Sequence, residues 1–298
     1  MADASWLTSF PQLSRMELLT IRKTLDGAYK AFSREYGDAI ESIFHPILAF
    51  LVWFEKLLIN TPWPIIILVI GAIVYFASRS WKLLTGVVIA LLLVGFFGMW
   101  EDTMSTLSMI TVCTLISIVL GIPIGIGMAR SDRFQKVMMP ILDVMQTMPA
   151  FVYLIPVVML LGIGKIPGLI SVVIYAIPPV IRLTNLGIRL VDSEVLEAAT
   201  AFGANGRQRL FNVQIPLAMP NIMAGINQTI MMALAMVVVA SMIGVKGLGQ
   251  PVLKSIQNQY FTLGLFNGLA IVALAIIFDR VSQAYAKRSQ KHMKGAHS

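Results

Sequence analysis

Few side chains in this sequence have the types and spacing that catalysis or metal binding requires. The histidines His45, His292 and His297 are scattered or lie in the tail, so they form no ligand cluster. Cys113 is the single cysteine and lies in an apolar run, which excludes an intrachain disulfide. The glycine-rich stretch 244–249, GVKGLG, lacks the spacing of a phosphate-binding loop and is read as a turn or as a hinge at an outer gate. We therefore expect no catalytic or metal site here and no cofactor on this chain.

A second group consists of uncharged polar side chains within apolar runs. Asparagine and glutamine need hydrogen-bond partners in hydrocarbon, so such side chains are expected to face the interior of a helix bundle. Lining of a pathway and contact between helices are both open interpretations. Tyr153 could in addition offer an aromatic face to a trimethylammonium group. These pathway candidates are Gln146, Thr147, Tyr153, Asn227, Gln228, Thr229 and Ser241.

The longest polar interval after the N-terminal arm, 187–216, predicts two short helices. Asp192 or Ser193 can cap the first helix, and Gly203 can end it in a left-handed conformation. Four apolar residues of this first helix recur at helical spacing and form one stripe: Val195, Ala198, Ala199 and Phe202. The second helix, about 207–213, is expected to end before Pro216. The element is either a docking site for another protein or a loop that packs on its own chain.

The composition indicates which kind of secondary structure positions these residues. Of 298 residues, 57% are hydrophobic and 13% are charged, and the mean hydropathy is +0.79. A soluble domain carries roughly 25% charged residues, so a soluble enzyme, a disordered chain and a disulfide scaffold are excluded. Seven apolar runs predict an all-α protein with about seven transmembrane helices. They are 63–77, 83–99, 107–129, 138–161, 169–183, 219–245 and 263–278.

The apolar segment 44–59 is short and carries Glu55 and Lys56 near one end. We interpret it as an interfacial helix that lies on the membrane, with a first transmembrane helix as the alternative. The residues before it lack the basic start and apolar core of a cleavable signal peptide.

The basic residues set the orientation. Cytoplasmic segments collect Lys and Arg, which places the C-terminus inside and, with seven spans, the N-terminal arm outside. The outer loops then keep only Lys165, Lys246 and Lys254. The inner segments hold Arg79, Lys82, Arg130, Arg133, Lys136, Arg182, Arg189, Arg207, Arg209, Arg280, Lys287, Arg288, Lys291 and Lys294.

Charged groups inside the spans are few. Asp143 and Arg182 lie near cytoplasmic ends, where they can form a pair. Carriers driven by protons or sodium usually place carboxylates or cations in mid-membrane, so their scarcity argues against that class. The scarcity of charged groups inside the spans suits a solute without net charge.

The polar interval closely resembles the EAA signature of ABC importer permeases. Glu197-Ala198-Ala199 is followed after three residues by Gly203, and after nine more by Val213, one residue and Ile215-Pro216. The family has isoleucine and leucine where Val213 and Ile215 stand. Further segments are similar to permeases of glycine betaine, proline betaine and choline importers: 145–156, 178–185, 224–229 and 240–249.

This resemblance implies a type I ABC importer permease in the bacterial cytoplasmic membrane, with ATPase coupling through Glu197, Ala198, Ala199, Phe202, Gly203 and Pro216. It also implies a homodimer, an ATPase subunit pair that binds ATP and Mg, an extracytoplasmic binding protein, membrane lipid and no nucleic acid. The expected division is an extracytoplasmic arm, 1–60, two peripheral helices, 61–104, a core permease domain, 105–283, and a basic cytoplasmic tail, 284–298. Alternatives are a similar permease for trimethylamine N-oxide or an amino acid, and an ion-coupled secondary carrier.

Overall fold

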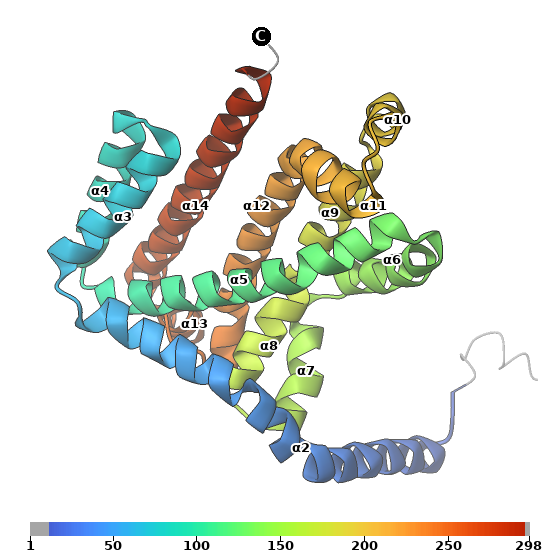
Figure 1. The fold of residues 1–298 in the computed structure, drawn as a ribbon. Helices are drawn as coiled ribbons and strands as arrows, with labels where there is room; N and C mark the ends of the chain where they lie inside the picture. Colours follow the sequence, from blue (N-terminus) through green and yellow to red (C-terminus); the bar gives the residue numbers. More distant parts are fainter. Residues whose placement is uncertain (1–11, 296–298) are drawn as a thin grey trace, which may run out of the picture.

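The computed structural model describes residues 12–295, with side chains described as far as residue 285. Within that range the chain is helical and has no strand, so the all-α prediction is confirmed (Figure 1). The elements are α2 (Arg15–Asn60), α3 (Trp63–Ser78), α4 (Trp81–Phe96), α5 (Trp100–Arg130), α6 (Asp132–Thr147), α7 (Ala150–Leu161), α8 (Lys165–Ala176), α9 (Pro178–Arg189), α10 (Ser193–Ala201), α11 (Gly206–Gln208), the π-helix η1 (Arg209–Gln214), α12 (Ile215–Ala240), the 3-10 helix η2 (Ser241–Ile243), α13 (Gly249–Asn258) and α14 (Phe261–Gly295).

The centre of the bundle is formed by α5, α8, α9 and α12. Glycines bring the backbones of these helices together: a Cβ atom at Gly125 of α5 would lie 2.7 Å from the carbonyl oxygen of Ile181 in α9. A Cβ atom at Gly225 of α12 would lie 3.1 Å from the Cα of Val180. Small residues at helix contacts are typical of membrane proteins, in which close packing rather than water exclusion drives helix association.

All seven predicted runs fall on helices. Among the described residues, five segments are long and apolar enough to cross a membrane: Arg15–Asn60, Trp100–Arg130, Lys165–Arg189, Gly206–Ile243 and Phe261–Tyr285. The helices α3 and α4 are apolar but have 16 residues each. They pack on each other and on α14 at the edge of the bundle (Figure 1).

The run 138–161 differs from a single span. Its helices, α6 and α7, are bent by 100° at the break between them. Met148 is extended there, with φ −68° and ψ 132°, because a residue that precedes proline disfavours the helical conformation. This stretch is therefore a broken span or a re-entrant segment.

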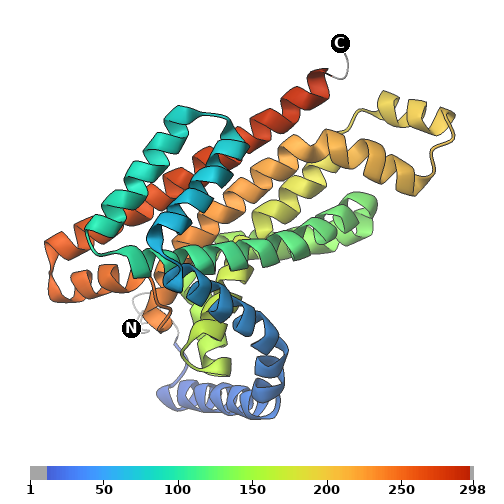
Figure 2. The ribbon, with the colours of Figure 1, turned by 60° about the vertical axis from the view of Figure 1, so that its left-hand side comes forward.

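The predicted interfacial segment is the second half of α2, a longer helix than the sequence indicated. Its two halves contact the same end of the bundle. Ser33 binds the carbonyl of Leu160 at the end of α7, and Glu55 pairs with Lys165 at the start of α8. A straight helix between Ser33 and Glu55 would be about 33 Å long, whereas Leu160 and Lys165 border one short turn. The helix therefore bends, with Pro46 in its interior, and lies across this end (Figure 2).

Candidate functional site

The predicted short helix in the long polar interval is α10. The Asp192 carboxylate caps it by accepting a hydrogen bond from the backbone N–H of Glu194 at 2.9 Å. Gly203 adopts the left-handed conformation, with φ +81°, and the N–H of Ala204 donates to the carbonyl of Ala199 at 3.0 Å. The predicted start and the glycine stop of this helix are both confirmed.

The apolar stripe of α10 is not covered by the part of the chain that the structure describes. The Phe202 ring is 93% exposed and the Val195 side chain is 42% exposed, while Ala198 is exposed and Ala199 half-buried. No residue of α10 is buried. A loop that merely packed on its own spans would bury this stripe, so the structure removes that alternative for the chain on its own.

The opposite face of α10 is polar. It borders a groove of about 490 Å³ lined by Ser193, Leu196, Glu197, Thr200, Ala201 and Arg209. Within residues 12–285, Glu197 forms no ion pair, although Arg209 donates to the hydroxyl of Thr200 at 3.3 Å. The carboxylate of Glu197 is thus available to a partner.

The segment after Gly203 fixes α10 to the bundle. The side chain of Asn205 accepts hydrogen bonds from the N–H groups of Arg207 and Gln208, and the Gln208 side chain accepts one from the N–H of Asn205. This reciprocal cap starts α11. Leu210 is 3% exposed and packs with Ile188 and Ile222.

The predicted end of the second helix before Pro216 is wrong. The chain continues through η1 directly into α12. The N–H of Ile215 reaches back to the carbonyl of Leu210, which is the wider π-helical turn. Because Pro216 lies in the first turn of α12, its missing N–H does not break that helix. From α11 onward the helical path into the central helix α12 is continuous, and the non-helical residues 202–205 join α10 to its start.

Arg189 is a further anchor that the sequence alone did not single out. Its guanidinium donates to the carbonyl of Met128 at 2.9 Å and to the side chain of Asn185 at 3.1 Å, and it pairs with Asp132 at 2.7 Å. It joins the ends of α5 and α9 to the start of α6. The predicted pair of Asp143 and Arg182 also forms, between α6 and α9.

The pathway candidates do not gather in one cavity of the described chain. Gln146, Thr147 and Gln228 are exposed, which differs from the expected interior position, while Ser241 and Thr229 are buried. The Tyr153 ring is 6% exposed, its hydroxyl donates to the carbonyl of Met145, and its edge meets Tyr175. In this conformation it presents no open face to a cation.

Asn227 contacts a carboxylate inside the bundle. Its amide donates to Asp279 of α14 at 2.9 Å and accepts from Ser282, while Gln283 donates to the same carboxylate at 2.8 Å. The predicted role of interhelical contact fits Asn227. Among the described residues no group of histidine, cysteine and carboxylate side chains could hold a metal ion.

Comparisons with known proteins agree with the signature. Residues 117–291 match the family described as binding-protein-dependent transport system inner membrane component. The glycine betaine/proline betaine transport system permease protein ProW of Escherichia coli is 44% identical over 304 residues, which cover 96% of this chain and 84% of that protein. The glycine betaine/carnitine transport permease protein GbuB of Listeria monocytogenes is 44% identical over 257 residues, covering 86% and 90%.

A solved structure of the methionine ABC transporter MetNI superposes with a TM-score of 0.57 at 18% identity. The match covers 62% of this chain and 93% of that chain, and it shows the shared permease fold. With the family match over more than half of the chain and relatives similar over most of its length, the chain belongs to the binding-protein-dependent transport system inner membrane components, the permease subunits of ABC importers.

Proposed function

We propose that this chain forms the pathway of an importer for a quaternary ammonium solute of the glycine betaine class. The similarity to betaine permeases over 96% of the chain supports the solute class. A net-neutral solute needs no buried counter-charge, and the exposed polar candidates Gln146, Thr147 and Gln228 could meet a second copy across a pathway.

The observation that carries the proposal is the uncovered stripe of α10. A helix with Val195 and Phe202 exposed, small alanines between them and a short link through α11 and η1 into α12 is suited to a cleft on another protein. We propose that an ATPase subunit, which binds ATP and Mg, receives this stripe. Glu197, Ala198, Ala199 and Phe202 then make the contact, while Gly203 and Pro216 fix the geometry on either side of η1.

The proposed complex contains two copies of this chain, two ATPase subunits and a binding protein that delivers the solute from outside. The proposed orientation places the N-terminal arm outside and the C-terminus in the cytoplasm. In Figure 2 the α5–α6 turn, α10 and the end of α14 point away from α2, which supports one basic cytoplasmic end opposite the arm. The ATPase would move α10, and α12 would pass that motion to the pathway.

The test is to purify the complex from its native membrane through a tag on this chain and to identify the proteins that come with it. We expect an ATPase and a binding protein, and we expect glycine betaine to raise the melting temperature of that binding protein. If only trimethylamine N-oxide or an amino acid raised that melting temperature, the proposed solute class would be wrong. Transport that survives ATP depletion but stops with a proton uncoupler would refute the importer assignment.

A further inference from the structure

The first half of α2 contacts the carboxyl end of α7 through one stripe. The hydroxyl of Ser33 donates to the carbonyl of Leu160 at 3.0 Å, and the Tyr29 hydroxyl donates to the carbonyl of Pro156. Gly37 continues the stripe, and a Cβ atom there would lie 3.3 Å from the oxygen of Leu160. The last carbonyls of a helix lack partners within the helix, so α2 supplies a donor where α7 ends.

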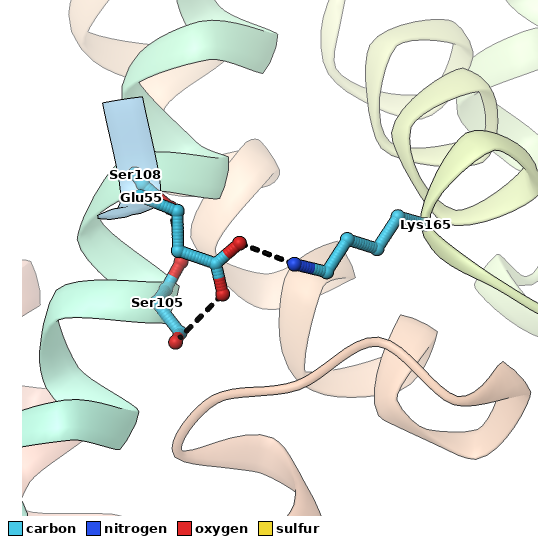
Figure 3. Close-up of polar contacts among 4 residues, drawn as sticks. All are labelled: Glu55, Ser105, Ser108 and Lys165. Carbon is cyan, nitrogen blue, oxygen red and sulfur yellow. Dashed lines mark hydrogen bonds and ion pairs between the residues drawn. The ribbon is translucent and has the colours of Figure 1, made fainter. Parts of the chain in front are cut away.

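The second half of α2 supplies the opposite charge to the next helix. Glu55 is 7% exposed and forms an ion pair with Lys165, the first residue of α8 (Figure 3). Its other oxygen accepts a hydrogen bond from the hydroxyl of Ser105 in α5 at 3.0 Å. A helix begins with partial positive charge, to which Lys165 adds, so the carboxylate compensates for both.

The turn between α7 and α8 is held from both sides by these contacts, although its own backbone is permissive. Gly162 and Gly164 have φ values of +75° and +157°. The turn also touches the segment 244–249: a Cβ atom at Gly244 would lie 3.0 Å from a methyl carbon of Ile163. That segment is bound to α5, where the N–H of Leu248 donates to the Thr106 hydroxyl at 2.9 Å.

We propose that α2 is a fixed brace across this end of the pathway and that Glu55 and Lys165 are its positioning pair. The pair sets where α8 begins, and through the α7–α8 turn it sets the position of the segment 244–249. The contacts that α2 makes with α7 and α8 stay formed while the rest of the bundle changes conformation. This proposal rests on the proposed function only in that solute transport is its readout.

Variants that remove, reverse or swap the two charges, made in the intact complex, test the pair. We expect Glu55→Gln to lower the maximal transport rate by about 10-fold, with the ATPase still co-purifying, because Lys165 and the start of α8 lose their counter-charge. Lys165→Glu should be at least as impaired. The double variant Glu55→Lys with Lys165→Glu should recover most of the rate, a rescue expected only if the two charges act on each other.

Glu101 provides a matched control, since it is an exposed carboxylate near the same end, in the first turn of α5. Glu101→Gln should transport at the normal rate. Normal transport by Glu55→Gln, or a double variant no better than the single ones, would overturn the positioning role. If the wild-type chain failed to transport glycine betaine, the proposed function and not the brace would be at fault.

A cross-link distinguishes a fixed brace from a latch that opens. Cysteines at positions 55 and 165, joined by a short bifunctional methanethiosulfonate reagent that forms a reducible disulfide with each thiol and releases methanesulfinate, should restore transport above that of the same variant before cross-linking. A cross-linked complex that loses its remaining transport and regains it on reduction would overturn the fixed brace.

Discussion

The helices α10 and α2 lie at opposite ends of the bundle and expose different chemistry (Figure 1). In α10 the apolar stripe is uncovered, with Phe202 93% exposed, and the helix packs on η1, which follows it in the chain. In α2 the side chains that face the bundle, Ser33, Leu51 and Glu55 among them, have partners on α5, α7 or in the central cluster.

The difference separates an apolar stripe available to another protein from contacts of α2 that are completed within the chain. An uncovered apolar stripe gains stability when a partner removes it from water. A buried carboxylate that already has a lysine and a serine needs nothing further, and removing one partner leaves the other buried and unsatisfied. Substitutions in α10 should therefore affect association, whereas those in α2 should affect the chain itself.

The largest effect is expected for Phe202→Ser. An exposed aromatic at the centre of an interface contributes about 2 kcal/mol or more, so the ATPase should bind about 30-fold more weakly. The melting temperature of the chain alone should not change, because Phe202 has almost no contact within it. Binding of purified ATPase to the chain in nanodiscs measures the effect.

Ser193→Ala is the matched control, because it removes only a hydroxyl at the first residue of α10 and leaves the stripe unchanged. It should bind the ATPase normally. Equal affinities for wild type and Phe202→Ser would show that the stripe is not the docking surface.

A smaller loss is expected for Gly203→Val. A side chain at φ +81° is strained by roughly 1–2 kcal/mol, and a β-branched one is the least suited to it. No atom lies within 4 Å of a Cβ atom at Gly203, so the effect is conformational and not a clash. Transport should fall by about 10-fold relative to ATP hydrolysis, which proteoliposomes with both assays can measure.

Gly206 lies in equally open space but has no positive φ, so Gly206→Ala should be neutral. Gly203→Asn should be milder than the valine variant, since asparagine tolerates the left-handed conformation. If transport by Gly203→Val stayed as tightly coupled to ATP hydrolysis as in the wild type, Gly203 would not be the element that orients α10.

Local signals allowed the helix α10 to be predicted from the sequence. The start and end of α10 depend on Asp192 and Gly203, whose side-chain chemistry and conformation act within a few residues. The lengths of the apolar runs likewise predicted where the long helices lie. The break between α6 and α7 could not be predicted from Pro149 alone, because whether a proline kinks or breaks a span depends on the neighbouring helices.

Apart from the pair of Asp143 and Arg182, contacts between distant segments could not be predicted. Glu55 and Lys165 are far apart in the sequence, and each by itself resembles an ordinary charge at a membrane surface. The wide π-turn before Pro216 also escaped prediction, since a proline after a short polar segment more often marks the end of a helix.

At the other end of the bundle, Gly37→Leu should destabilise the chain by about 1–3 kcal/mol, because the added atoms meet the backbone oxygen of Leu160. The first half of α2 should then become sensitive to proteolysis, while ATPase binding is unchanged. Gly27→Leu is the control, since nothing lies within 4 Å of a Cβ atom there. Equal protease resistance of the two variants would refute the close contact between α2 and α7.

The smallest effect is a pH dependence at the start of α2. The Glu17 carboxylate accepts hydrogen bonds from the hydroxyl of Ser14 at 2.7 Å and from its N–H at 2.9 Å, and these hold the pKa of Glu17 below its ordinary value. Ionised Glu17 thus stabilises the helix start fully above about pH 5, and this stabilisation is lost as the pH falls through the lowered pKa. Amide exchange over residues 14–18 should quicken relative to the rest of α2 at low pH. Ser14→Ala should remove that pH dependence, and an unchanged dependence in this variant would exclude the capping box as its source.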